Sequence, residues 1–138
     1  MRMNYKDYTD QMACDDPSRI ANKGNFVYIC SPFRGDIRVN VMRARRYCRF
    51  AVSKGRIPIA PHLYFPQFVS DTTERETAFG MNFELMKLCS EVWVFGVERS
   101  EGMTRELAHA DALGKTILYF TTSCEEVSYT KIMGRDGR

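Results

Sequence analysis

An alternation of strand-like and helix-like segments is the feature that most constrains how this chain can fold. Short apolar runs with the length and composition of buried strands occur at residues 26–30, 57–60, 92–95 and 116–120. The intervening segments predict helices over residues 39–54, about 72–89 and 103–113, the second of them capped by Asp71 or Thr72. Strands that alternate with helices predict an α/β fold with a parallel sheet and right-handed crossovers.

The same alternation predicts where a ligand would bind. In open parallel sheets, ligands bind beyond the carboxyl ends of the strands, at the point where the strand order reverses. If the spatial order is second, first, third and fourth strand, the reversal lies between the first and third strands. Residues 31–36 and 97–106 would then form the two sides of one crevice.

Composition excludes several broad classes of protein. The chain has 138 residues, of which 44% are hydrophobic and 27% charged, a balance typical of a globular domain. No segment approaches the ~20 apolar residues of a membrane helix, and the first twenty residues do not resemble a secretory signal. We therefore expect a soluble, cytoplasmic protein with no membrane partner. The net charge of +3 comes mainly from arginines at 43–49 without interleaved aromatics, so a nucleic-acid polymer is an unlikely partner.

The cysteines and histidines indicate neither a disulfide framework nor a metal site. The five cysteines are widely spaced, no C-x-x-C occurs, and the two histidines lie far apart. We expect reduced thiols that act as small hydrophobic residues, and a protein without metal or cofactor.

The first crevice loop carries Ser31, Arg34 and Gly35. A hydroxyl, a guanidinium and a glycine that lets backbone amides approach are suited to holding a phosphate or a sugar. The alternative is a turn with an exposed arginine. Neither the P-loop pattern nor G-x-G-x-x-G occurs, which disfavours a P-loop NTPase and a nicotinamide dinucleotide fold.

The second crevice loop leads from Ser100 through Gly102 to Glu106. Gly102 permits close approach of a ligand, and Glu106 falls in the first turns of the following helix. A helix N-terminus favours an ionised carboxylate, so Glu106 is a candidate nucleophile. The alternative is an acidic residue that only complements the helix dipole.

Together these segments resemble a known family. The motifs are Y-I-C-S-P-F-R-G-D at 28–36, P-I-A-P-H at 58–62, E-V-W-V-F-G at 91–96, S-x-G-M-x-x-E-L-x-x-A at 100–110 and G-K at 114–115. They resemble the nucleoside 2-deoxyribosyltransferase-like superfamily, and are most similar to a small branch of uncharacterised phage and bacterial members. The resemblance covers about residues 26–120.

The resemblance implies a fold and a chemistry. It implies one domain with a flavodoxin-like (Rossmann-like), doubly wound parallel sheet of four to five strands. It implies cleavage or transfer of the N-glycosidic bond of a (deoxy)nucleoside or nucleoside 5′-monophosphate, with Glu106 as the nucleophile and Tyr28 beside it. The positions that match its 5′-phosphate site, with their motif neighbours, give a substrate-binding set of Ser31, Arg34, Gly35, Ser100, Gly102 and Met103. The alternative function is non-catalytic binding of a nucleotide or nucleotide-derived signal in the same pocket.

The chain departs from the family at the residue that handles the base. Transferases carry an aspartate in the helix before the third strand, and the strict register here falls on Phe83. Asn82 and Glu84 are the two candidates to replace it. A second acidic residue of the family, shortly before the glycine of the third-strand loop, is replaced here by Ser100. The branch of the family that hydrolyses nucleotides has the same replacement. The sugar-attacking half of the reaction is therefore better supported than base exchange.

Several further residues have open roles. His62 either contacts the ligand or caps the second strand, whereas His109 is expected to be packed or solvated. The aromatic residues of the loop 63–68 and Phe79 predict the contact of a homodimer or a dimer of dimers. The alternative is a lid folded over the crevice of the same chain.

We divide the chain into a polar extension (1–24), the α/β domain (25–122) and a tail (123–138), in which residues 125–133 form either a short helix or an edge element.

Overall fold

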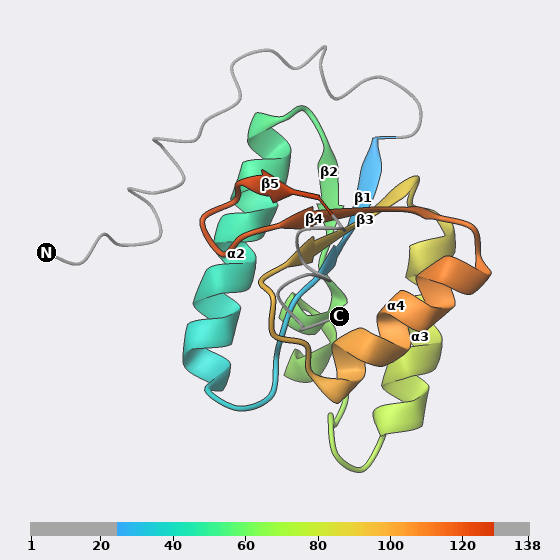
Figure 1. Cartoon of the computed structure of the whole chain (residues 1–138). Coiled ribbons are helices and arrows are strands. Elements are labelled where there is room, and N and C mark those ends of the chain that lie inside the picture. Colours follow the sequence, from blue (N-terminus) through green and yellow to red (C-terminus); the bar gives the residue numbers. More distant parts are fainter. Residues whose placement is uncertain (1–24, 129–138) are drawn as a thin grey trace, which may run out of the picture.

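The computed structural model describes residues 25–128 and contains one mixed sheet (Figure 1). The strands are β1 (Phe26–Cys30), β2 (Ile57–Ile59), β3 (Glu91–Phe95), β4 (Thr116–Phe120) and β5 (Glu126–Val127), in the spatial order β2-β1-β3-β4-β5. The first four strands are parallel, and β5 pairs antiparallel with β4. The expected α/β fold is confirmed, with the strand order reversing between β1 and β3. The predicted extension 1–24 and residues 129–138 of the predicted tail lie outside the described residues.

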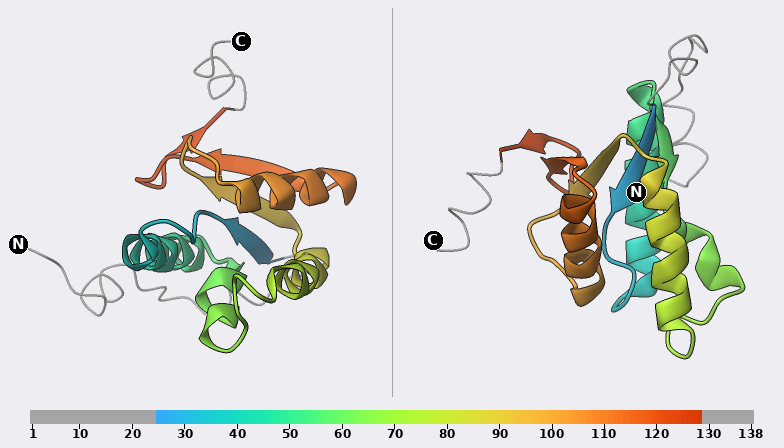
Figure 2. Two further views of the ribbon diagram at one scale, coloured as in Figure 1. Left: turned by 90° about the horizontal axis from the view of Figure 1, so that it is seen from below. Right: turned by 90° about the vertical axis from the view of Figure 1, so that its right-hand side faces the viewer.

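Helices cover both faces of the sheet (Figure 2). Helix α2 (Ile37–Ser53) lies on one face, and α3 (Arg75–Lys87) and α4 (Glu101–Ala112) lie on the other. Two short 3-10 helices, η2 (Pro61–Leu63) and η3 (Phe65–Gln67), occupy the connection between β2 and α3. No helix within residues 25–128 is long and apolar enough to cross a membrane.

Strand alternation divides the core into two clusters. On β1, Val27 and Ile29 pack towards α2, whereas Tyr28 and Cys30 pack towards α3 and α4. The α2-side cluster comprises Val27, Ile29, Tyr47, Ala51, Trp93, Phe95 and Phe120. The α4-side cluster comprises Tyr28, Cys30, Met86, Cys89, Val92, Val94, Met103, Leu107 and Ala110. Trp93 belongs to the α2-side cluster of this core and is only 4% exposed.

Side-chain caps set the starts of the two helices that flank the crevice. The Asp36 carboxylate accepts a hydrogen bond from the Val39 amide, so α2 begins two residues before the expected start. The Ser100 hydroxyl accepts one from the Met103 amide, and α4 begins at Glu101. Ser100 therefore fixes the start of the helix that carries Glu106.

The expected start of α3 at Asp71 or Thr72 is wrong. Residues 71–74 form a turn, in which the Ser70 hydroxyl accepts hydrogen bonds from the amides of Thr72 and Thr73. The Glu74 carboxylate accepts one from the Ser70 amide, and the helix begins at Arg75. Asp71 does not cap the helix because its carboxylate pairs with Arg34.

The described part of the tail forms an edge element rather than the start of a helix. Residues 121–125 turn the chain, with Cys124 at a φ of 64°, and β5 then pairs with β4.

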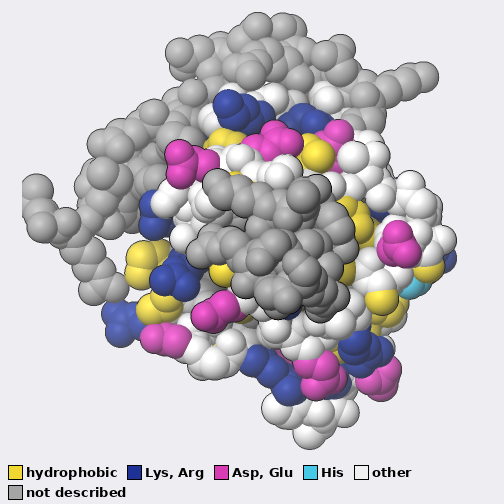
Figure 3. Space-filling model, viewed as in Figure 1, with side chains coloured by type: hydrophobic (Ala, Val, Ile, Leu, Met, Phe, Trp, Pro, Cys, Tyr) yellow, Lys and Arg dark blue, Asp and Glu magenta, His cyan; other side chains and the backbone are white. Residues whose placement is uncertain are grey.

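Cys30, Cys48, Cys89 and Cys124 are free thiols; Cys14 lies outside the described residues. On the face seen in Figure 3, Lys and Arg side chains are interspersed with Asp and Glu.

Candidate active site

A buried carboxylate lies at the point where the strand order reverses. Glu106, on the second turn of α4, is only 8% exposed, and its Oε2 accepts a short hydrogen bond from the Tyr28 hydroxyl. Burial is the largest influence on this group and raises the pKa of Glu106 to about 7, although the hydrogen bonds that it accepts oppose the rise. Burial also raises the pKa of Tyr28 well above its usual value, so this hydroxyl stays protonated and remains a donor.

A second donor holds the other oxygen of the same carboxylate. The Cys30 sulfur lies 3.7 Å from Glu106 Oε1, and burial raises the pKa of this thiol well above its ordinary value. Tyr28 and Cys30 are two residues apart on β1, so their side chains leave the same face of the strand. One strand therefore fixes both oxygens of Glu106.

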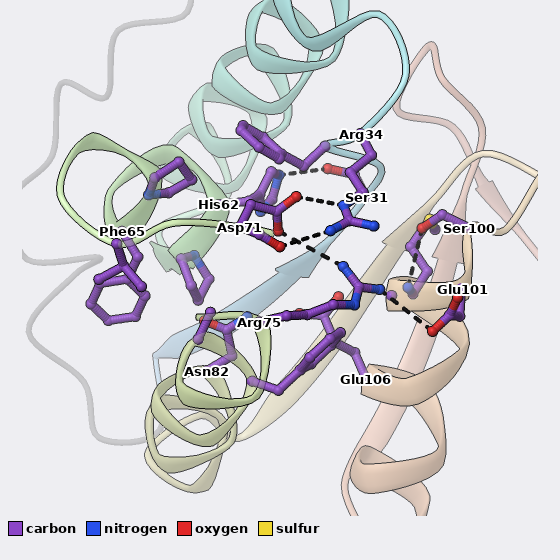
Figure 4. Close-up of a pocket in the computed structure, with 18 residues that line it drawn as sticks. Ser31, Arg34, His62, Phe65, Asp71, Arg75, Asn82, Ser100, Glu101 and Glu106 are labelled. Atoms are coloured by element: carbon purple, nitrogen blue, oxygen red, sulfur yellow. Dashed lines mark hydrogen bonds and ion pairs between the residues drawn. The ribbon is translucent and has the colours of Figure 1, made fainter. Parts of the chain in front are cut away.

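Glu106 opens onto a cavity of about 300 Å³ between β1, α3, α4 and the β2–α3 connection (Figure 4). Apolar and aromatic residues make up much of its wall, including Phe33, Phe65 and Phe79. The polar side chains that line it are Ser31, Arg34, His62, Asp71, Arg75, Asn82, Ser100, Glu101 and Glu106. A partly apolar cavity with few convergent polar groups and a carboxylate of raised pKa is typical of an active site.

Ser31 and His62 form a neutral polar pair in the cavity wall. The Ser31 hydroxyl oxygen lies 3.0 Å from His62 Nε2. Burial lowers the pKa of His62 to about 4, so the imidazole is uncharged near neutral pH. His62 therefore lines the cavity, as one of its two interpretations expected, but brings no positive charge to it.

The charged groups of the cavity form a chain of ion pairs. Arg34 Nε lies 2.5 Å from Asp71 Oδ2, and Arg34 Nη2 donates to the Asp71 carbonyl oxygen at 2.7 Å. Arg75 Nη1 lies 3.8 Å from Asp71 Oδ1, and its Nη2 lies 3.6 Å from a Glu101 oxygen. Two guanidinium groups from different elements thus meet at one carboxylate (Figure 4).

Asn82 contributes an amide group to the cavity wall. It lines the cavity from α3, and its Oδ1 is buried yet accepts no hydrogen bond from the described residues. Gly102 lies on the opposite wall, where a Cβ would make an ordinary contact with the Phe79 ring at 3.6 Å. The cavity therefore keeps one free acceptor on the α3 side.

The structure brings together most of the predicted site residues. Those that line the cavity are Ser31, Arg34, Asn82, Ser100, Gly102, Met103 and Glu106. Tyr28 lies behind the wall and reaches Glu106. Gly35 does not line the cavity; its φ of 97° turns the chain into α2. Glu84 is also outside, because it faces solvent and pairs with Lys87 at 2.6 Å.

The sequence interpretation missed three residues of the site. Cys30 was assigned only to the core, although its place two residues after Tyr28 puts both on one face. Asp71 was considered as a helix cap, and Arg75 carried no signal because its role depends on how α3 lies against the β1–α2 loop. Such contacts depend on tertiary packing rather than on spacing along the chain.

The remaining aromatic and histidine residues divide between surface and core. Tyr64 and Phe68 are each 60% exposed and pack edge-on against each other, while Phe65 lines the cavity. Phe79 is buried, so it is not part of the expected exposed patch. His109 stacks on Phe83 with 4.0 Å between the ring centroids. Of the two expected positions for His109, packed or solvated, the structure shows the packed one.

Two solved structures that are similar to this chain are 2-deoxyribosyltransferases. A 2-deoxyribosyltransferase from Leishmania mexicana superposes with a TM-score of 0.55 and 20% identity over 70% of this chain. This chain spans only 64% of that enzyme's length. A 2-deoxyribosyltransferase from the psychrotolerant bacterium Bacillus psychrosaccharolyticus has the same TM-score and identity, over 79% of this chain and 80% of its own. At this identity the likeness establishes the deoxyribosyltransferase-like fold.

Comparison by sequence identifies a family but no characterised relative. A search of the curated proteins found no match to this chain. A family model described as a domain of unknown function (DUF7768) matches residues 25–120, which include both crevice loops, the cavity and Glu106. The chain therefore belongs to the DUF7768 family.

Proposed function

We propose that this protein cleaves or transfers the N-glycosidic bond of a (deoxy)nucleoside or nucleoside 5′-monophosphate, with Glu106 as the nucleophile. The observation that carries the proposal is the buried Glu106 carboxylate, held by Tyr28 and Cys30 beside a cavity of about 300 Å³. The fold shared with two 2-deoxyribosyltransferases supports it.

The proposed reaction has two steps at the anomeric carbon. The ionised Glu106 carboxylate attacks this carbon, the bond to the base nitrogen breaks, and the base leaves with the electron pair and takes up a proton. The resulting glycosyl ester is then attacked by water or by a second base, which restores the carboxylate. Tyr28 donates to the carboxylate throughout and keeps it oriented for both steps.

The remaining cavity residues suit a nucleotide-sized ligand. Arg34 and the hydroxyls of Ser31 and Ser100 provide donors for a sugar or a phosphate. The buried Asn82 Oδ1 is free to accept a hydrogen bond from a base. Of the two candidates for this role, Asn82 lines the cavity, whereas Glu84 does not. Phe65 and Phe79 offer apolar surface for a planar ring.

The buried Glu106 carboxylate separates this proposal from its alternative. A non-catalytic binder of a nucleotide or nucleotide-derived signal would use the same Arg34, Ser31 and Ser100. Such a binder would gain nothing from Glu106, whose pKa is raised to about 7. Burying this carboxylate lowers the stability of the fold, and the partly protonated group adds less than that to the affinity for a ligand. Catalysis is therefore the better-supported function.

The exposed pair Tyr64 and Phe68 supports the proposed association of two or four copies of this chain. These rings lie beside Phe65, which lines the cavity, so a partner placed there would lie near the site. Light scattering at micromolar concentration tests this, and a particle of monomer mass would contradict it. The cytoplasmic location and the independence from metal stay predictions.

Release of free base tests the proposed reaction. The protein is incubated with deoxyribonucleosides, ribonucleosides and their 5′-monophosphates, with and without a second free base, and the products are separated by chromatography. We expect Glu106→Gln to lower the rate by at least about 10³-fold, since it removes the attacking charge. Glu84→Gln, an exposed acid on α3, is the matched control and should keep the wild-type rate. Ligand binding without base release by the wild-type protein would favour the non-catalytic alternative.

A further inference from the structure

A second cavity of about 300 Å³ lies beyond the carboxyl ends of the strands, on the face of the sheet that α2 covers. Helix α2 contributes Asn40, Arg43 and Tyr47 to its wall, which are three and four residues apart and therefore share one face of the helix. The loop after β3 contributes Glu98. Ser31 lines both this cavity and the first cavity, beside Glu106, but no other residue is common to the two.

The charged side chains of the second cavity are one cation and one anion that do not meet. Arg43 and Glu98 are the charged residues that line it. Within the described part of the chain, neither forms an ion pair with the other or with any other residue. Opposite charges that line one cavity without pairing leave space for a molecule that contacts both.

Tyr47 adds a buried hydroxyl to the same wall. Its side chain is only 2% exposed, and its ring stacks on Phe95 with 4.1 Å between the ring centroids. The hydroxyl makes no hydrogen bond to another residue of the range 25–128. Asn40 is engaged elsewhere, because its amide nitrogen donates to the carbonyl oxygens of Phe33 and Arg34. Burial raises the pKa of Tyr47, so this hydroxyl stays protonated and can donate to a molecule in the cavity.

These groups suit a small molecule that carries both charges. A carboxylate can accept two parallel hydrogen bonds from the Arg43 guanidinium, and an ammonium group can donate to the Glu98 carboxylate. A phosphate or a nucleotide fits less well, because Glu98 would repel its charge and Arg43 alone would have to balance it. The volume of about 300 Å³ is at the small end of ligand cavities.

We propose that the second cavity binds a small zwitterion of the α-amino acid class, with its carboxylate on Arg43, its ammonium on Glu98 and the Tyr47 hydroxyl as a further hydrogen-bond partner. This site is separate from the proposed catalytic cavity and does not depend on the proposed function.

Thermal unfolding of the full chain with each of the common α-amino acids at millimolar concentration tests for binding, because a ligand of the folded state raises the Tm. Calorimetry then measures the Kd of the amino acid that gives the largest rise. The same measurement is made for its N-acetyl derivative, which lacks the ammonium, and for its amide, which lacks the carboxylate. We expect each derivative to bind about fivefold more weakly than the amino acid, or worse.

Three variants assign the groups of the ligand to residues of the cavity. Arg43→Ala should weaken the amino acid about fivefold, and should bind the amino acid and its amide with similar affinity, since the carboxylate then has no partner. Glu98→Gln should do the same for the amino acid and its N-acetyl derivative. Tyr47→Phe keeps the ring that stacks on Phe95 and removes only the hydroxyl, so it should weaken the amino acid about threefold or more.

Two control variants locate the ligand. Arg38→Ala removes an exposed guanidinium of α2 that does not line the second cavity, and Arg75→Ala removes one from the first cavity. Both should keep the affinity within about twofold of the wild-type value. Equal losses from Arg43→Ala and Arg38→Ala would overturn the proposal, as would no rise in Tm with any amino acid. So would a larger loss from Arg75→Ala than from Arg43→Ala, which would place the ligand in the first cavity.

Discussion

The two faces of the sheet are built for different purposes. On the α2 side, aromatic rings fill the core: Tyr47 stacks on Phe95 at 4.1 Å, and Phe95 on Phe120 at 5.0 Å. On the α4 side, aliphatic and sulfur-containing residues surround a buried carboxylate. The same strands supply both faces, since β1 sends Val27 and Ile29 to one and Tyr28 and Cys30 to the other.

Burying the Glu106 carboxylate lowers the stability of the fold, and the α2-side cluster can offset this loss. A buried carboxylate lowers stability when it ionises, because it leaves water for a medium of low dielectric constant. The aromatic α2-side cluster contributes apolar burial and ring contacts that do not depend on pH. We therefore expect stability to be determined largely on the α2 side, and the titration of Glu106 on the α4 side.

Removing an aromatic ring from the α2 side gives the largest expected effect on stability. Phe95→Ala leaves a cavity between Tyr47 and Phe120 and should lower the free energy of unfolding by about 3–5 kcal/mol. The pH dependence of stability should not change. Urea unfolding at several pH values measures both. Phe95→Leu, with an expected loss of about 1–2 kcal/mol, serves if the alanine variant does not fold; a changed pH dependence in either would contradict the separation of the two faces.

Glu106→Gln should stabilise the protein above neutral pH. The pKa of Glu106 is raised from its ordinary 4.5 to about 7 in the folded protein, so between these values the folded state binds the additional proton. Wild-type stability should fall as pH rises from 4.5 through 7, by about 2–3 kcal/mol, and this fall should be absent from the variant. Urea unfolding at pH 4.5 and pH 8 measures the difference. Equal pH dependence of the two proteins would show that Glu106 ionises normally.

Tyr28→Phe should move the titration of Glu106 to higher pH. The Tyr28 hydrogen bond lowers the pKa of Glu106, so its loss leaves burial less opposed. We expect the midpoint of the pH–stability curve, and of the pH–rate curve if base release occurs, to rise by about one pH unit. A midpoint that stays near 7 would mean that Tyr28 only fills space beside the carboxylate.

Cys30→Ala should have the smallest effect, in the same direction. A thiol is a weak donor, and the Cys30 sulfur lies 3.7 Å from Glu106 Oε1. The midpoint should rise by about a few tenths of a pH unit, and Cys30→Ser should bring it back. Cys89→Ala, another buried thiol of the α4-side cluster, is the control and should leave the midpoint unchanged. A larger shift from Cys30→Ala than from Tyr28→Phe would reverse the assigned order of the two donors.

The sequence predicted the features that depend on local pattern. The apolar runs at β1 and β3 follow from residue type, whereas the cap at Ser100 was not predicted and starts α4 two residues before the expected residue 103. Glu106 could be singled out because it falls at a helix start beyond a buried strand. These are the elements for which a few neighbouring residues determine the structure.

Other parts of the site could not be predicted, because they depend on contacts between distant residues. Asp71 has the residue type of a helix cap, but the cross-chain pair with Arg34 competes for its carboxylate. Glu84 and Asn82 are two residues apart on one helix, and only the packing of α3 decides that Asn82 faces the cavity and Glu84 faces solvent. Helical spacing alone does not give the orientation of a helix against the sheet.

The short outer strands of the sheet have a consequence for self-association. On β2, the Ile57 amide donates to the Asn25 carbonyl at 2.8 Å, so by alternation Pro58 lies at the outer edge, where it offers no N–H. At the opposite edge, β5 is only two residues long. Copies of this fold are thus poor templates for one another's backbones, and continuous strand pairing of the kind that leads to fibrils is disfavoured at both edges.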